Sequence, residues 1–223
     1  MPALIRLLAH AAIAGLICGL LLTAVQRVSV EPLLLRAEAI ESASDVASPS
    51  GHAHEAQEAM PSGWRRTALT VAANIVIAVG FALLLGAGMT VSQDSGWRAG
   101  LVWAAAGYFV FFVAPSLGLP PELPGADSAP LLQRQRWWLL ATVLSAAGLW
   151  IAVYFDRAIA RIFGVGLLVI PHLIGAPLPP IHRSLVPDEL CSAFVRATGI
   201  ANAILWLALG VSMGYFQRRT RRR

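Results

Sequence analysis

Residues 68–91 read ALTVAANIVIAVGFALLLGAGMTV, a stretch without a single charged side chain. A helix needs about 20 mostly apolar residues to cross the roughly 30 Å hydrocarbon layer of a bilayer. This stretch meets that length and therefore predicts a membrane-spanning helix. The rest of the chain repeats the pattern on both sides of it.

Five further apolar segments have enough length to cross a membrane when packed among other helices. They are Leu4–Val25, Gly100–Leu117, Trp137–Phe155, Ile159–Ala176 and Ala193–Phe216. The chain is 57% hydrophobic and 13% charged, and its mean hydropathy is +0.67, far from the composition of a soluble domain. We therefore expect residues 1–223 to form one all-α integral membrane domain, a polytopic bundle of about six transmembrane helices.

The first apolar segment also allows a second interpretation, as a signal peptide with Arg6 in its basic n-region. Its apolar stretch is long for that role, and residues 23–25 (Thr-Ala-Val) match a cleavage site poorly. We expect this first helix to be retained. Its removal would leave five spans.

The orientation rests mainly on the tail 217–223, which holds five arginines. Arginines that flank a span stay on the cytoplasmic side, so we expect a cytoplasmic C-terminus and, after six spans, a cytoplasmic N-terminus. The expected location is the bacterial inner membrane. The connections expected on the outer face are 26–66, 118–136 and 177–192.

The carboxylates are distributed unequally under this orientation, with only Asp94 and Asp156 on the cytoplasmic side. The other ten face outward: Glu31, Glu38, Glu41, Asp45, Glu55, Glu58, Glu122, Asp127, Asp188 and Glu189. Such a surface would concentrate cations at the outer entrance. Anionic membrane lipid explains the basic tail, so the net charge of +5 requires no nucleic-acid partner.

The connection 26–66 carries the acidic and histidine residues that first suggest metal. His52 and His54 precede Glu55 and Glu58, and imidazole with carboxylate suits borderline divalent ions such as cobalt, nickel or zinc. The preceding residues, Ser-Pro-Ser-Gly at 48–51, are typical of a linker. We therefore read 26–66 as an outer loop that collects ions weakly, with a solvated loop and incidental histidines as the alternative.

His172 is the candidate ligand within an apolar span, directly after Pro171. Proline donates no backbone hydrogen bond and so frees a carbonyl one turn earlier, and an ionisable side chain inside a span is a functional candidate. The alternative is a neutral histidine that bonds a neighbouring carbonyl. Because metal binding needs neutral imidazole, uptake should weaken as the external pH falls below the ordinary histidine pKa of about 6.5.

Four polar residues could line a translocation path: Gln26, Glu31, Asn74 and Asn202. Buried amides more often join helices through hydrogen bonds, so both interpretations stay open. Small residues mark close helix contacts: Gly15 and Gly19, and again Gly210 and Gly214, lie four apart on one helical face.

Motifs of enzymes and nucleotide-driven motors are missing from the sequence. It has no G-x-S-x-G, no H-E-x-x-H and no G-x-x-x-x-G-K-[ST]. We therefore expect a protein that is not an enzyme and holds no tightly bound cofactor.

Two proline-containing stretches are similar to the signatures of a known family. Residues 114–125 read APSLGLPPELPG and residues 171–177 read PHLIGAP. Both resemble the CbtA family of predicted cobalt transporter subunits, as do LLTAVQ at 21–26 and RQRWW at 134–138. The resemblance runs from the first span to the last.

The resemblance implies divalent cobalt as the transported ligand, uptake linked to cobalamin synthesis, and a small single-span CbtB partner with a histidine-rich end. It also implies metal-related roles for His52, His54, Glu122 and His172. Prolines around Glu122 stiffen its loop, so this acid marks either the outer mouth of a path or a rigid turn with a solvated carboxylate. Two other functions stay open, an accessory or scaffold subunit without its own path and a transporter of nickel or another divalent metal.

Overall fold

The structure is a computed structural model that describes residues 2–47, 63–179 and 184–221. The long helices of this part are α1 (Pro2–Ser29), α2 (Glu31–Ala47), α3 (Trp64–Val91), α4 (Trp97–Tyr108), α6 (Leu131–Tyr154), α7 (Ala158–Ile174) and α8 (Asp188–Arg221). The π-helix η1 (Phe109–Val113) and the single turn α5 (Ala114–Ser116) prolong α4. The described residues contain helices and no strand, which confirms the predicted all-α class.

Five helices in the described part are long and apolar enough to cross a membrane: Leu4–Ser29, Trp64–Val91, Trp97–Ser116, Leu131–Tyr154 and Asp188–Thr220. The sixth predicted span is the shorter apolar helix α7, of 17 residues. That length is at the lower limit for a transmembrane helix. The bundle therefore has five long spans and one short apolar helix.

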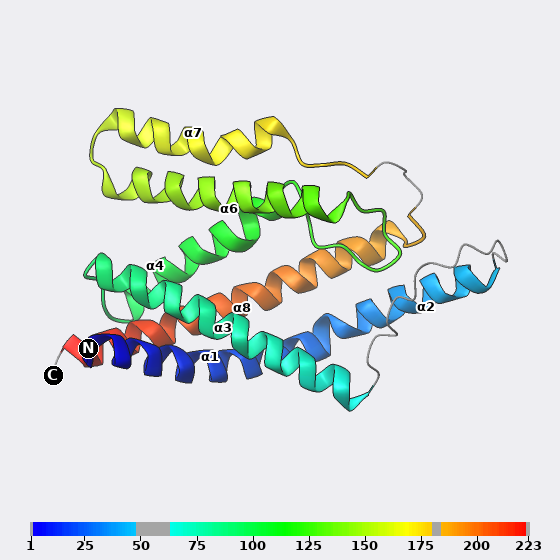
Figure 1. Cartoon of the computed structure of the whole chain (residues 1–223), viewed down its shortest axis with the longest axis horizontal. Helices are drawn as coiled ribbons and strands as arrows, with labels where there is room; N and C mark the ends of the chain where they lie inside the picture. The colour runs from blue at the N-terminus through cyan, green and yellow to red at the C-terminus, as the bar shows by residue number, and fades with distance from the viewer. Residues whose placement is uncertain (1, 48–62, 180–183, 222–223) are drawn as a thin grey trace.

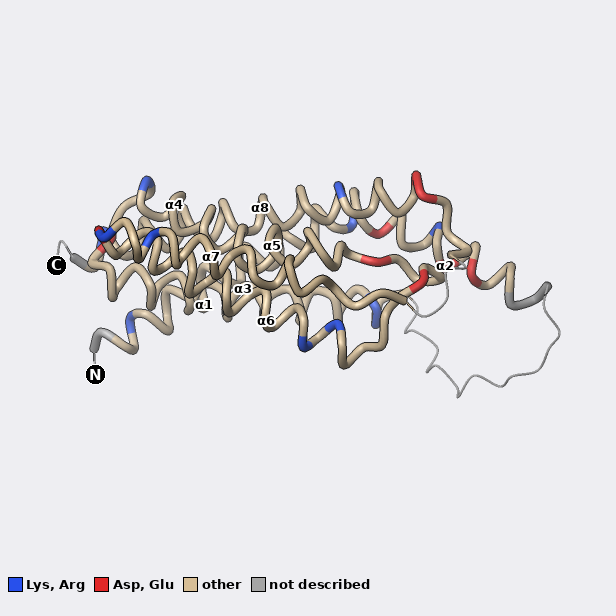
Figure 2. Tube along the Cα trace, turned by 90° about the horizontal axis from the view of Figure 1, so that it is seen from above, with Lys and Arg blue, Asp and Glu red and all other residues tan. Residues whose placement is uncertain are grey.

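Helices α1, α3, α4, α6, α7 and α8 run alternately in opposite directions, so both ends of the described chain lie at the same end of the molecule (Figure 1). The turns at 92–96 and 155–157 lie at that end as well. Figure 2 shows arginines at both ends, whereas the acidic residues gather mainly at the opposite end, where α2 lies. This separation of charge is the one expected from the predicted connections.

The region 26–66 is not a loop throughout, which corrects the sequence interpretation. α1 continues to Ser29, and α2 then extends beyond it to Ala47 (Figure 1). The sequence EPLLLRAEAIESASDVA is rich in good helix formers. Its apolar residues Leu33, Leu34 and Ala37 pack with Leu123 and Val186, which lie in the connections before α6 and before α8. This burial stabilises a helix in a segment whose polar composition predicts a loop.

Close helix pairs form the core, and glycines allow their approach. A Cβ on Gly15 of α1 would lie 2.3 Å from Cγ2 of Val79 of α3. The two helices can approach this closely only because residue 15 has no side chain. A Cβ on Gly210 would lie 2.3 Å from the carbonyl oxygen of Gly100, which joins α8 to α4. Both contacts confirm the predicted packing role of the glycine pairs.

The core itself lies among α1, α3, α4 and α8. Trp206, Leu205, Leu209 and Met213 of α8 are almost fully buried there, together with Met89 of α3. Helices α6 and α7 form a separate hairpin, held together where Gly148 meets Gly164. This hairpin contacts the remaining helices mainly through η1 and α5, and so a wedge remains between α4 and α6.

Candidate functional site

Four of the predicted metal ligands, His52, His54, Glu55 and Glu58, lie outside the described residues. The other predicted residues fall in four separate places, and Asn202 lies alone on α8. Gln26, Glu31 and Asn74 lie on α1 to α3 toward the end of the bundle opposite the termini, Glu122 lies in the connection before α6, and His172 lies in the last turn of α7.

Asn74 is the centre of a small polar group between α1 and α3. Its Nδ2 donates hydrogen bonds to Thr23 Oγ1 at 3.0 Å and to Gln26 Oε1 at 2.7 Å, and its side chain is buried. Thr23 Oγ1 in turn donates to the carbonyl of Gly19. We call Thr23, Gln26 and Asn74 the amide cluster. It brings together two predicted path residues from different helices and places oxygen atoms inside an otherwise apolar contact.

Glu31 does not join the amide cluster. Its carboxylate accepts hydrogen bonds from Arg27 at 2.8 and 2.9 Å, across the junction of α1 and α2. Arg27 also donates to Thr67 of α3 at 3.3 Å. Beyond this pair, Arg66 of α3 donates from both terminal guanidinium nitrogens to the Glu38 carboxylate of α2, at 2.8 and 3.1 Å. These paired charges therefore join α1, α2 and α3 at the end of the bundle opposite the termini, next to the amide cluster.

Glu122 forms an ion pair with Arg134 of α6. The following residue, Leu123, is buried under α2 and fixes the loop. A hollow of about 350 Å³ lies beside the pair, lined by the adjacent prolines and by Leu131 and Trp138. A cation at this carboxylate would have to compete with the Arg134 guanidinium.

His172 lies half-buried against Trp137 of α6. The two ring centres are 5.9 Å apart in an edge arrangement. The Trp137 indole donates to the carbonyl of Pro171 at 3.3 Å, and the backbone amide of Gly175 donates to the same oxygen at 3.1 Å. Gly175, with a φ of 83°, then ends α7. The helix end around His172 is thus fixed by two bonds to the Pro171 carbonyl, one from a side chain and one from the backbone, and neither uses the imidazole.

Asn202 lies apart from the amide cluster, on α8. Its Nδ2 donates to the carbonyl of Thr198 at 2.9 Å, a bond within its own helix. Nearby, the Tyr108 hydroxyl donates to the carbonyl of Gly199 at 3.1 Å and so links α4 to α8. Asn202 therefore contributes a polar group to the core without joining two helices through this bond.

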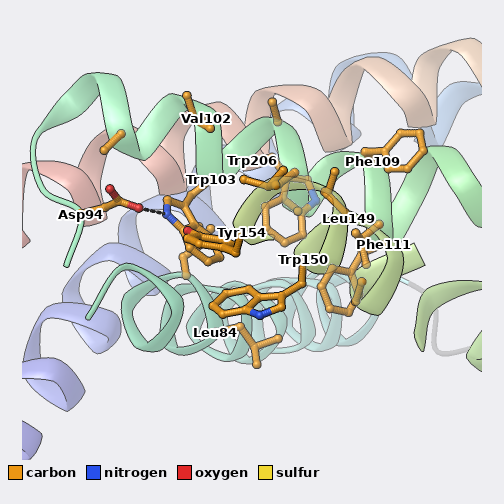
Figure 3. A pocket seen from close by; sticks show the side chains of 18 of the residues that line it. Leu84, Asp94, Val102, Trp103, Phe109, Phe111, Leu149, Trp150, Tyr154 and Trp206 are labelled. Atoms are coloured by element: carbon orange, nitrogen blue, oxygen red, sulfur yellow. Dashed lines mark hydrogen bonds between the residues drawn. The ribbon is translucent and has the colours of Figure 1, made fainter. Parts of the chain in front are cut away.

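The sequence reasoning missed an apolar cleft between α4 and α6, with a volume of about 790 Å³ (Figure 3). Aromatic rings of Trp103, Trp150 and Tyr154 lie in its wall, and Trp206 of α8 lies behind them (Figure 3). At one end, Asp94 accepts hydrogen bonds from Trp103 Nε1 at 2.9 Å and from the Ser92 hydroxyl at 2.5 Å. We call this the aromatic cleft. Hydropathy detects each helix but not the angle between two helices, so it could not reveal it.

Within the described part of the chain, no three side chains of His, Cys, Asp or Glu are grouped as a metal site would require. The polar groups at the predicted positions lie apart from one another: amide and hydroxyl oxygens at the amide cluster, a paired carboxylate at Glu122 and an imidazole at His172. Amide and carboxylate oxygens are hard ligands, whereas imidazole suits cobalt and nickel. These groups fit successive weak contacts with a passing cation.

Comparison with known proteins gives a family and two partial relatives. The family model described as probable cobalt transporter subunit (CbtA) matches residues 4–218. Lysoplasmalogenases from Mycobacterium bovis and Mycobacterium tuberculosis are each 32% identical in an alignment of 129 positions that covers 47% of this chain and 49% of theirs. The chain thus spans about half the length of these curated relatives. No solved structure matches the chain significantly.

Proposed function

The chain belongs to the CbtA family of probable cobalt transporter subunits, and from that membership we propose that it takes up divalent cobalt across the bacterial inner membrane for cobalamin synthesis. The observation that carries the proposal is the family match over residues 4–218, nearly the whole chain. The all-helical bundle with five long apolar helices supports it, because a path for an ion needs several helices around it.

Cobalt enters at the end where the acidic residues gather (Figure 2). Both termini are cytoplasmic in this proposal, supported by the arginine-rich tail and by the positive-inside rule. The outer negative field concentrates the divalent ion, and His52, His54, Glu55 and Glu58 collect it. The ion is cargo, so no tightly bound cofactor is proposed.

Glu122 then accepts the ion at the outer mouth as Arg134 releases the carboxylate. His172 and the amide cluster are the polar groups that follow, on two different helix pairs. Glu31 and Asn202 are the weaker path candidates, because the Glu31 carboxylate already accepts from Arg27 and Asn202 bonds a carbonyl of its own helix. A residue on the true path must change uptake without changing the amount of folded protein.

The family description names a subunit, so we propose a partner. The partner is a small single-span protein of the CbtB type, whose histidine-rich end supplies the imidazoles that a cobalt site needs. The test measures radiocobalt accumulation in cells that express this chain, the partner, or both. If cells that express only the partner accumulate cobalt, this chain has an accessory role. If accumulation requires expression of this chain, the result supports a path through it.

Selectivity and direction separate the remaining alternatives. Nickel added in excess leaves cobalt accumulation high if the path prefers cobalt, and it abolishes the signal if nickel is the real cargo. Loss of preloaded cobalt from cells that express the pair would show export instead of uptake.

We also propose that the chain is a transporter subunit without enzymatic activity. The family description supports this, and the sequence lacks the G-x-S-x-G and H-E-x-x-H motifs. The similarity to lysoplasmalogenases covers about half of each chain, so that activity can be tested directly. Purified protein incubated with a lysoplasmalogen should leave it intact, and its hydrolysis at a rate above buffer would refute the proposal.

A further inference from the structure

The aromatic cleft is an elongated apolar space that opens sideways, toward the hydrocarbon of the surrounding membrane. Val102 and Val153, on its two opposing helices, are 70% and 61% exposed. Leu84 of α3 closes one side, and Trp206 of α8 forms part of the inner wall (Figure 3). Because α6 contacts the bundle mainly through η1 and α5, no helix in the described part fills the space between α4 and α6.

The volume of the cleft indicates whether a helix or an acyl chain would fit it. A helix is about 10–12 Å across, so 790 Å³ would hold roughly one and a half turns of a partner helix. A methylene group given the ~30 Å³ share of a water molecule makes a sixteen-carbon chain roughly 480 Å³ in volume. The cleft therefore fits one acyl chain with room for its bends, and it is too small for a membrane-spanning helix.

The end of the cleft near Asp94 carries an excess of positive charge. Arg98 follows the start of α4 beside the lining residue Ala99, and Arg157 lies three residues after the lining residue Tyr154. Asp94, the carboxylate at this end, already accepts two hydrogen bonds from Ser92 and Trp103. Its charge is thus partly compensated.

Two more arginines lie at the same end. Arg161 of α7 pairs with the exposed Asp156 at 3.3 Å, and the side chain of Arg218 lies beside Gly96. These four arginines lie at the same end of the bundle as Asp94 and Asp156, and Arg98 and Arg157 form no ion pair with any residue that the structure describes. A phosphate group is the chemical complement of such an arrangement.

We propose that the aromatic cleft binds one anionic phospholipid, with an acyl chain between α4 and α6 and its phosphate beside Arg98 and Arg157. The lipid completes the apolar packing of the α6–α7 hairpin against the bundle. The site is independent of the cobalt path, because neither the amide cluster nor Glu122 or His172 lines it.

Native mass spectrometry of the purified full chain tests this site. Protein stripped of lipid in detergent is titrated with dipalmitoyl phosphatidylglycerol and, separately, with dipalmitoyl phosphatidylcholine. Ala146→Trp fills the cleft from α6, and Ala105→Trp fills it from α4. Val76→Trp adds the same ring to an exposed position of α3 that does not line the cleft, and thermal unfolding in detergent verifies that each variant is folded.

The expected result is one phosphatidylglycerol per chain, bound at least fivefold more tightly than phosphatidylcholine. Both cleft-filling variants should weaken this binding at least tenfold, and Val76→Trp should change it less than twofold. The Arg98→Gln, Arg157→Gln double variant should bind the two lipids equally. Unchanged binding in a folded cleft-filling variant, equal binding of the two lipids by the wild type, or a co-purified polypeptide lost from those variants would overturn the proposal.

Discussion

Replacing Asn74 by alanine should destabilise the contact between α1 and α3 by about 1.2 kcal/mol. The change removes two hydrogen bonds, to Thr23 Oγ1 and to Gln26 Oε1. Interhelical hydrogen bonds in membrane proteins average about 0.6 kcal/mol each, with a maximum near 1.7 kcal/mol. An unfolding equilibrium shifts tenfold per roughly 1.4 kcal/mol, so the expected shift is about sevenfold.

The assay is reversible unfolding of the purified protein in mixed micelles, followed by the far-ultraviolet helix signal. A double-mutant cycle of Asn74→Ala with Gln26→Ala isolates the amide pair. A coupling of about 0.5–1.5 kcal/mol is expected, since the 2.7 Å bond is the shorter of the two. Additive effects within about 0.2 kcal/mol would show that the pair does not stabilise the helix contact, and the reasoning would fail.

The same variant separates structure from transport. A sevenfold shift leaves most of a normally stable protein folded, so the amount of protein in the membrane should change little. If the amide cluster contacts the moving ion, the rate of cobalt uptake per folded protein should fall at least tenfold. Uptake that follows only the amount of folded protein would restrict the cluster to helix packing.

Three further predictions concern the glycine contact between α1 and α3, the Glu122–Arg134 ion pair and the half-buried imidazole of His172. In chemical unfolding, Gly15→Leu should destabilise the protein by about 1–3 kcal/mol, because the Cβ of the new side chain would overlap α3. Gly80→Ala should change the free energy of unfolding little, because the space around Gly80 is open. Arg134→Gln should strengthen cobalt capture at Glu122 by removing the competing guanidinium, seen as a lower half-saturating concentration for uptake; an unchanged value would exclude that carboxylate from the mouth. His172→Ala should lower cobalt accumulation at least fivefold at constant protein amount, and level accumulation would remove His172 from the path.

The positions of the apolar spans could be predicted from hydropathy, but their ends could not. The fourth span was predicted from Trp137, whereas α6 begins at Leu131 after Pro130. The difference arises because Gln133 to Arg136 are polar but helix-forming, and an apolar window does not count them. The last helix begins early, at Asp188, for the same reason.

The polar contacts of the candidate site required the fold. Gln26 and Asn74 could be identified as amides within spans, but nothing in their spacing of 48 residues shows that α1 and α3 are neighbours. The pairing of Glu122 with Arg134 likewise depends on how the proline-rich loop folds back over α6. Helix α2 was predicted as loop because its apolar face becomes visible only against the outer connections that cover it.

The central place of α8 has a consequence for biosynthesis. The core residues Leu205, Trp206, Leu209 and Met213 all belong to this last helix, and α8 packs on α1, α3 and α4. A ribosome delivers the chain from its N-terminus, so the earlier helices reach the bilayer before the helix that joins them exists. During that interval the small-residue surface around Gly100 has no cover from its own chain. The core of this protein can therefore form only at the last step of synthesis, when α8 inserts between helices that are already in the membrane.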